Sequence, residues 1–295
     1  MDVGGNFVES EKLKTIRIIP RLDIKGPNLV KGIHLEGLRV LGKPEDFAQY
    51  YFENGADELF YQDVVASLYE RNSLGEIITA TAKKSFIPLT VGGGIRTVDD
   101  IKNVLRAGAD KVSVNTAAIK SPDFIKEASR KFGSSTIVVA IEAIKQPDGK
   151  YLAFVDNGRE HTGVEVFEWA KKLQDLGAGE ILLTAVDKEG VGLGFDLELT
   201  KTISMSVEIP VIAHGGAGKL EHITEVINEG MADAVTVASM FHYDFIANVQ
   251  SNMDSRTEGN VNFLQSGRIN FGKIQPHNIL QLKEYLKSHN INCRN

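Results

Sequence analysis

The chain carries an internal repeat. Three segments of its first half return in the second half, in the same order and at an offset of 122 or 123 positions. The paired segments begin at Gly55 and Gly177, at Gly92 and Gly215, and at Ala109 and Ala232. Such self-similarity at one offset indicates two related halves with one common fold. Any architecture for this chain must therefore accommodate a duplicated unit.

Each half alternates short apolar runs with amphipathic stretches. The apolar runs predict eight strands at 16–22, 59–61, 86–91, 112–114, 136–141, 180–186, 209–213 and 234–238. The amphipathic stretches predict helices at 44–53, 98–107, 122–132, 164–176, 198–206, 220–229 and 276–288. Nearly continuous apolar strands separated by helices form parallel sheets that are buried on both faces. We predict one α/β domain over 1–295, a (β/α)8 TIM barrel built from two half-barrels.

Two polar segments fall outside this alternation, an N-terminal extension at 1–14 and an insert at 248–275 in the last strand-to-helix connection. The net charge of −6, from 33 basic and 39 acidic residues, argues against general nucleic-acid binding. The single Cys293 excludes an internal disulfide and fits a reducing compartment. With no membrane-length apolar run and no secretory start, we expect a soluble, cytoplasmic protein. The histidine and cysteine spacings predict no metal site, and no cofactor is expected.

In a parallel barrel, functional residues gather where the strands end. Asp23 and Glu142 end the first and fifth predicted strands, and they are counterparts in the two halves. Either one alone is typical of a helix cap. Two carboxylates that face each other across one mouth suit general acid–base catalysis, because burial and mutual repulsion separate their pKa values. Other polar residues at predicted strand ends are Asp63, Asn115, Thr116 and Asp187.

Glycine clusters follow the third and seventh predicted strands, each just before a helix. Glycine lets the backbone approach an anion, and a helix N-terminus supplies amide hydrogens. We predict one phosphate site from Gly94, Asn115 and Thr116, and a second from Gly216, Ala238 and Ser239. The alternative is that these glycines only form tight turns. Two phosphate sites imply a ligand with a phosphate at each end.

Two further predictions concern the same mouth. The long loop at 25–43 is expected to fold over it and bring Lys31 to a phosphate or to developing charge. His214 ends the seventh predicted strand and is expected to contact the ligand. The Gly-Val-Gly-Leu-Gly run at 190–194 lacks the spacing and context of a dinucleotide fingerprint, so we predict a flexible loop there.

The runs at 21–25, 91–95, 114–118, 177–184 and 215–219 together resemble the cyclase subunit of imidazole glycerol phosphate synthase, a barrel of histidine biosynthesis. The resemblance covers 16–243 and resumes at 280–292. It implies that ammonia reacts with a bisphosphorylated aminoimidazole carboxamide ribonucleotide to give imidazole glycerol phosphate and the carboxamide ribotide. It also implies a heterodimer in which a glutaminase docks on the N-terminal face and sends ammonia through the barrel.

Residue by residue, the resemblance assigns catalysis to Asp23 and Glu142. It assigns the ammonia gate to four charged residues at strand starts, Arg17, Glu58, Lys111 and Glu180, and a partner contact to Asp110. A plain structural ring of salt bridges would give the same four residues. The expected substrate and phosphate ligands are Lys31, Gly94, Asn115, Thr116, Thr184, Asp187, Gly190, His214, Gly216, Ala238 and Ser239.

The chain departs from the family pattern only on the active face. Glu142 and Glu189 stand where the family has aspartate, and Asn157 and His214 stand where it has serine. These departures, with the insert, leave two alternatives open. One is a paralogue that passes ammonia to another phosphorylated or sugar acceptor, and the other is a weakly catalytic subunit that activates its glutaminase. The sister isomerase of the same pathway ranks last, because its pattern lacks the gate.

Overall fold

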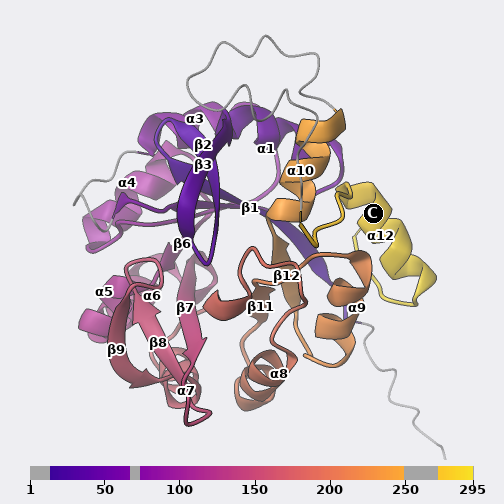
Figure 1. Ribbon diagram of the computed structural model, residues 1–295. Coiled ribbons are helices and arrows are strands. Elements are labelled where there is room, and N and C mark those ends of the chain that lie inside the picture. The colour runs from indigo at the N-terminus through magenta and orange to yellow at the C-terminus, as the bar shows by residue number, and fades with distance from the viewer. Residues whose placement is uncertain (1–13, 67–73, 249–271, 295) are drawn as a thin grey trace, which may run out of the picture.

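The computed structural model describes residues 14–66, 74–248 and 272–294. Most of the predicted N-terminal extension and of the 248–275 insert lies outside the described residues. The predicted barrel is confirmed (Figure 1): every strand pairs in parallel with both neighbours, and the β10–β7 and β1–β12 pairings complete the ring. Its strands, in ring order, are β1 (Arg17–Lys25), β4 (Leu59–Asp63), β5 (Leu89–Gly92), β6 (Lys111–Val114), β7 (Ile137–Lys145), β10 (Glu180–Ala185), β11 (Val211–His214) and β12 (Ala234–Val237).

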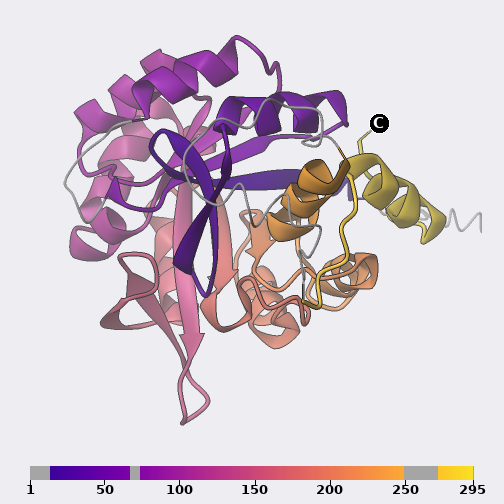
Figure 2. The ribbon, with the colours of Figure 1, turned by 45° about the horizontal axis from the view of Figure 1, so that its top comes forward.

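Helices surround the barrel, as Figures 1 and 2 show. Their apolar faces pack on the outward side chains of the strands in one continuous core. No helix of the described segments has the length and hydropathy needed to cross a membrane. The helices are α1 (Pro44–Glu53), α3 (Gly75–Ala82), α4 (Val98–Ala107), α5 (Thr116–Lys120), α6 (Asp123–Phe132), α7 (Val166–Asp175), α8 (Leu197–Ser206), α9 (Leu220–Asn228), α10 (Ser239–Asn248) and α12 (Ile279–Ser288), with short 3-10 turns η1 (Ser134–Thr136) and η2 (Val186–Lys188).

Two β-hairpins extend the barrel, and the sequence analysis missed both. The strands β1 and β7 are nine residues each, longer than predicted, and their ends pair antiparallel with a hairpin. The first hairpin, β2 (Asn28–Ile33) with β3 (Glu36–Gly42), replaces the predicted loop at 25–43. The second, β8 (Tyr151–Val155) with β9 (Glu160–Glu165), occupies the residues before α7. Their equivalent positions extend the predicted duplication to features beyond the barrel.

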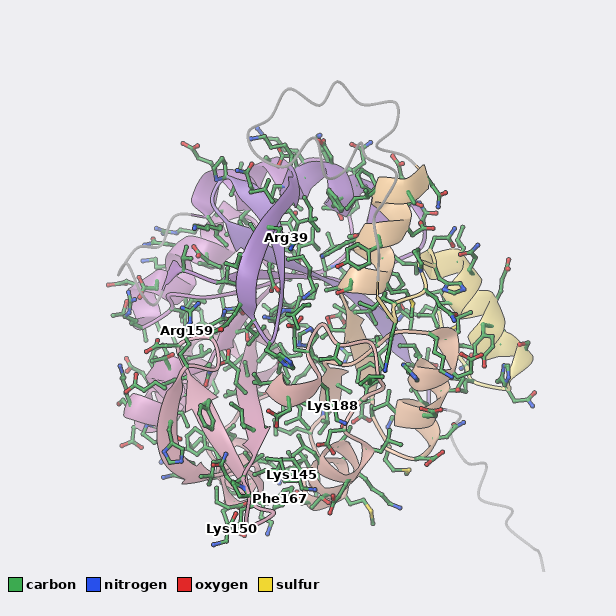
Figure 3. The ribbon with its side chains drawn as sticks, viewed as in Figure 1. Arg39, Lys145, Lys150, Arg159, Phe167 and Lys188 are labelled. Atoms are coloured by element: carbon green, nitrogen blue, oxygen red, sulfur yellow. The ribbon has the colours of Figure 1, made fainter. Side chains whose placement is uncertain are left out.

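The turn between β7 and β8 forms a polar edge of the molecule. Figure 3 shows Lys145, Lys150 and Phe167 close together at one edge of the molecule, with Arg39 of the first hairpin far from them. There the Lys145 ammonium lies 5.1 Å from the centroid of the Tyr151 ring and forms an exposed ion pair with Glu198. Such solvated pairs contribute little to stability.

The inside of the barrel is layered. Successive residues of a strand point to opposite faces, so alternate residues of β1 project inward. Arg17 lies in the bottom layer at the strand starts, and Arg21 and Asp23 lie in the top layer at the strand ends. Between them a small apolar cluster fills the middle: Ile19, Phe60, Val138, Ala140, Leu182, Ile212 and Ala234. A polar top and a charged bottom are thus separated by an apolar layer.

The repeated Ala-Asp motif has a structural cause. Asp57, Asp110 and Asp233 precede β4, β6 and β12, and the carboxylate of each accepts a hydrogen bond from a backbone N–H at the start of a neighbouring strand, at 2.7, 2.9 and 2.8 Å. Gly179 takes the fourth equivalent place, where a Cβ would lie 2.1 Å from the Ser134 carbonyl oxygen. Asp110, predicted at the partner interface, therefore has a structural role at the N-terminal face.

Candidate active site

The four predicted gate residues meet in one ring at the bottom of the barrel. Arg17 Nη1 contacts Glu58 at 2.7 Å and Glu180 at 3.0 Å, and Lys111 Nζ contacts the same two carboxylates at 3.1 Å each. Burial opposes the charge of Arg17, but Glu180 and Glu58 outweigh it and raise its pKa. Burial likewise opposes the charge of Glu58, and Arg17 with Lys111 lowers its pKa. Each of the four residues thus has two partners of opposite sign in the ring.

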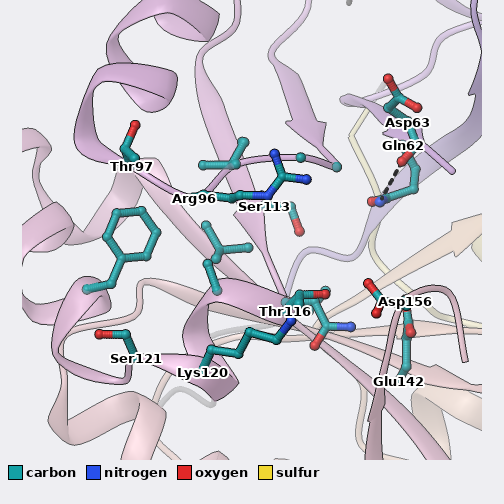
Figure 4. A pocket seen from close by; sticks show the side chains of 18 of the residues that line it. Gln62, Asp63, Arg96, Thr97, Ser113, Thr116, Lys120, Ser121, Glu142 and Asp156 are labelled. Atoms are coloured by element: carbon teal, nitrogen blue, oxygen red, sulfur yellow. Dashed lines mark hydrogen bonds between the residues drawn. The ribbon is translucent and has the colours of Figure 1, made fainter. Parts of the chain in front are cut away.

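A cavity of about 910 Å³ opens at the other end, where the strands finish. Figure 4 shows its wall, where Arg96 lies beside Ser113, Lys120 lies beside Thr116, and Glu142 lies with Asp156 at one side. Gly94, Asn115 and Thr116 all line this cavity, so the structure brings the predicted first phosphate site together. Asn115 is further fixed by donating to the Phe154 carbonyl at 3.2 Å.

The two predicted acid–base residues come from opposite sides of the barrel at its strand ends: Glu142 lines the cavity, whereas Asp23 does not and instead binds Arg21, which does. Their strands, β1 and β7, are four steps apart in either direction around the ring. Asp23 is 3% exposed, and its Oδ1 accepts from Arg21 Nε at 2.7 Å. Glu142 is 8% exposed, and its Oε2 accepts from the Gly158 N–H at 2.7 Å. Burial raises the pKa of Glu142 to about 7 even though Gly158 and Arg21 favour its charged form. One carboxylate is thus paired with a cation, while the other holds its proton near neutral pH.

The second predicted phosphate site, unlike the first, is not part of the cavity wall. Gly216 follows β11, while Ala238 and Ser239 follow β12 and lead into α10, all of them at the strand ends. None of the three is among the residues that line the cavity. The 190–194 run, predicted as a flexible loop, packs there: the Gly194 N–H donates to the Gly216 carbonyl at 2.8 Å, and a Cβ on Gly216 would lie 2.1 Å from the Gly194 carbonyl oxygen.

The first hairpin is fastened over the mouth by the loop after β10. Lys31 forms a buried ion pair with Glu189, whose other oxygen accepts from the Leu35 N–H at 3.0 Å. Asn157 adds a bond from its amide to the Leu35 carbonyl at 3.0 Å. Two of the four departures from the family pattern therefore hold this hairpin. Lys31 has a carboxylate partner here, so its predicted contact with a phosphate is not present in this arrangement. Gly190 lies beneath the same hairpin, against Gly32 and Ile33.

Of two other predicted ligands, Thr184 lies at the mouth and Asp187 does not. Thr184 lines the cavity, and its hydroxyl is 3.1 Å from Nδ1 of the buried His214. Burial, with Arg21 and Lys31, lowers the pKa of His214 well below its ordinary value, so its ring is neutral. Asp187, by contrast, is exposed and accepts from the Lys145 N–H at 3.0 Å. The structure does not bring Asp187 to the mouth, because η2 turns it outward and Glu189 takes the buried position.

One residue of the mouth was overlooked. Arg21 begins the motif at 21–25 and has no role among the sequence predictions, yet it is buried, lines the cavity and binds Asp23. The available signal was a charged residue two positions before Asp23, on the inward face of an apolar strand.

Comparison with known proteins agrees with this geometry. The family model described as "Histidine biosynthesis protein" matches residues 17–247. The chain is 58% identical over 209 residues to the imidazole glycerol phosphate synthase subunit HisF of Legionella pneumophila, across 71% of this chain and 99% of that protein. This chain belongs to the HisF family. HisF of Methanocaldococcus jannaschii is 49% identical over 78% of this chain and 91% of its own length, and that of Alkaliphilus metalliredigens is 46% identical over 79% and 92%.

Family membership confirms the resemblance drawn from the five motifs. The matched span begins at the first gate residue, Arg17, and ends at 247, within α10. It therefore includes the whole barrel, the ring, the mouth and both hairpins, and ends before the 248–275 insert.

Proposed function

We propose that this chain is the cyclase subunit of imidazole glycerol phosphate synthase in histidine biosynthesis. It uses ammonia to convert a bisphosphorylated, formimino-type aminoimidazole carboxamide ribonucleotide into imidazole glycerol phosphate and aminoimidazole carboxamide ribotide. One observation carries the proposal: in a HisF-family barrel, Asp23 and Glu142 lie on opposite strands at one mouth, directly above a complete charged ring.

The mouth supports this chemistry through two carboxylates in different environments. Asp23 is paired with a guanidinium and serves as the base that accepts a proton from the attacking nitrogen. Glu142, with a pKa of about 7, serves as the acid that donates to the departing oxygen or nitrogen. Each such proton transfer contributes about 10²–10⁴-fold in rate. The phosphate groups of the substrate would be held at Gly94, Asn115 and Thr116 on one side and by Gly190, Gly216, Ala238 and Ser239 on the other.

The ring is proposed as the entrance for ammonia and the N-terminal face as the place for a glutaminase partner. Each charge of the ring has two partners, so the entrance opens only when one contact breaks. Above it lies the apolar layer, which an uncharged molecule such as ammonia crosses far more readily than an ion. On the outer side, Phe86 is 78% exposed beside Asp110, in a shallow depression suited to a partner surface. The single cysteine and the biosynthetic role support a cytoplasmic location.

The test is an assay of the purified full chain with the bisphosphate substrate near neutral pH, with enough ammonium salt to supply free ammonia while Glu142 keeps its proton. We expect imidazole glycerol phosphate as product, and its loss in Asp23→Asn. Folded wild-type protein that yields no product would end the proposal.

A second candidate keeps the ring and changes the acceptor to another phosphorylated or sugar compound. The observation that favours it is that all four departures lie at the mouth, where Glu189 and Asn157 hold the hairpin and Glu142 extends farther than aspartate. A chain that stimulates a glutaminase yet fails to rescue a cyclase-deficient histidine auxotroph would favour this candidate. Full rescue would exclude it.

A further inference from the structure

Arg21 is a buried cation whose hydrogen-bonding capacity is mostly unused. Its side chain is 4% exposed, its Nε donates to Asp23 at 2.7 Å, and its guanidinium lies 5.7 Å from the centroid of the Phe60 ring. Its two terminal nitrogens make no hydrogen bond to the described part of the chain. A guanidinium carries five N–H donors, and only the Nε–H donor of Arg21 has a partner among the described residues. A structural ion pair would not need to leave four of them free.

Arg21 forms part of the cavity wall, together with Ser113, whose buried hydroxyl also lacks a partner among the described residues. Within the mouth, Arg21 acts on both sides. It opposes the burial-driven rise in the pKa of Glu142, and after burial it is the next cause of the lowered pKa of His214. The charge of Arg21 on β1 thus affects the pKa values of Glu142 on β7 and of His214 on β11.

Arg21 also marks the end of the route from the ring. Ile19 of the apolar layer lies below Arg21 on β1, and Arg17 lies one layer lower on the same strand; Phe60 is the register partner of Arg21 on β4. A small uncharged molecule that rises through the apolar layer reaches the layer of Arg21 and Asp23 at the strand ends. An acceptor carbon bound beside this pair would be within reach of that molecule.

We propose that Arg21 is a third catalytic residue, whose terminal N–H donors bind the carbonyl oxygen of the acceptor carbon that ammonia attacks. The proposal rests on the function proposed above and specifies how that site activates its acceptor. The nitrogen lone pair forms the C–N bond, and the π pair of the C=O bond moves to oxygen, where Arg21 stabilises it. Asp23 takes a proton from nitrogen, and Glu142 gives its proton to oxygen. Asp23 then returns its proton as water leaves, and the C=N bond forms as nitrogen returns a proton to Glu142.

The kinetic test compares Arg21→Met with Arg106→Met, a matched change at an exposed position of α4. Ammonium salt replaces glutamine, so the ring and the partner do not limit the rate. Removing a donor to a developing oxyanion lowers kcat by about 10²–10³-fold. We expect this loss of kcat in Arg21→Met, and less than about threefold change of kcat in Arg106→Met. Added guanidinium chloride should partly restore the kcat of Arg21→Met, and methylammonium chloride should not. A kcat of Arg21→Met within threefold of wild type would overturn the proposal.

A binding test judges Arg21 without turnover and separates it from the proposed function. The probes are ribulose 1,5-bisphosphate, with a carbonyl between two phosphates, and pentane-1,5-diol bisphosphate, with none. A hydrogen bond from a charged donor supports at least about tenfold in affinity. We expect Arg21→Met to weaken only the first probe by that factor. Equal weakening of both probes would make Arg21 a phosphate ligand, and no weakening would make it a structural partner of Asp23; either result contradicts the proposal. If the wild-type chain formed no product from the ribonucleotide in the assay above, that result would contradict the proposed function and not the role of Arg21 in binding a carbonyl.

Discussion

The two ends of the barrel use charge in opposite ways. At the bottom, Arg17, Glu58, Lys111 and Glu180 satisfy one another in a closed ring. At the top, Arg21 leaves donors free, and Glu142 titrates near neutral pH. A satisfied network stabilises one arrangement and resists ions, whereas incompletely paired groups remain available to a ligand. The difference indicates that the bottom controls passage and the top performs chemistry.

The largest expected effect comes from removing the charge at the top. Asp23→Asn retains the shape of the side chain but cannot accept a proton from ammonia. We expect kcat with ammonium salt to fall by about 10³-fold, since a general base typically raises the rate by about 10²–10⁴-fold. The same change at the exposed Asp148, on the β7–β8 turn, should leave kcat within about twofold. A loss smaller than tenfold in Asp23→Asn would show that the top is not the chemical end.

Glu142→Gln is expected to lower kcat by about 10²-fold, because the amide cannot donate a proton in place of the acid. Since burial raises the pKa of Glu142 to about 7, the acid form is present below that pH and is lost above it. At constant free ammonia, wild-type kcat/KM should therefore fall as pH rises through about 7. This fall of kcat/KM with pH should be absent in Glu142→Gln. In Glu142→Asp it should be retained, but the rate should be lower because the shorter side chain displaces the carboxyl group. An unchanged fall in Glu142→Gln would assign it to another group.

The same group makes stability depend on pH. The folded pKa of about 7 exceeds the ordinary 4.5, so the folded state holds the proton more tightly. The stabilisation from that proton is fully present below pH 4.5 and is lost as pH rises through about 7, a change of about 3 kcal/mol. Urea unfolding at pH 5 and pH 8 should show this loss in wild type and a smaller one in Glu142→Gln. Equal losses in the two proteins would contradict the assignment.

The smallest effect on chemistry is expected at the bottom. Arg17→Met leaves Glu58 and Glu180 with Lys111 alone, which should destabilise the fold by up to about 3 kcal/mol. With ammonium salt, kcat should stay within about threefold of wild type. With a glutaminase and glutamine, product formed per glutamine hydrolysed should fall several-fold. If the ammonium-driven rate fell as far as in Asp23→Asn, the two ends would not have separate roles.

The sequence predicted the barrel, the ring and the opposed carboxylates because each follows from periodicity or from counterparts in two halves. It missed the hairpins, since β2, β3 and β9 are polar enough to read as loop, and their pairing depends on the long ends of β1 and β7. Asp187 was chosen over Glu189 because strand counting cannot foresee the 3-10 turn that reverses their exposure. The closure of the 190–194 run over Gly216 likewise depends on tertiary packing.

A crystal structure of the full chain with the bisphosphorylated ribonucleotide, without ammonia, tests the central claim most directly. We predict one phosphate at Gly94, Asn115 and Thr116, the other at Gly216, Ala238 and Ser239, and the acceptor carbon between Asp23 and Glu142. A ligand held by one phosphate only, or with its middle remote from both carboxylates, would contradict this account.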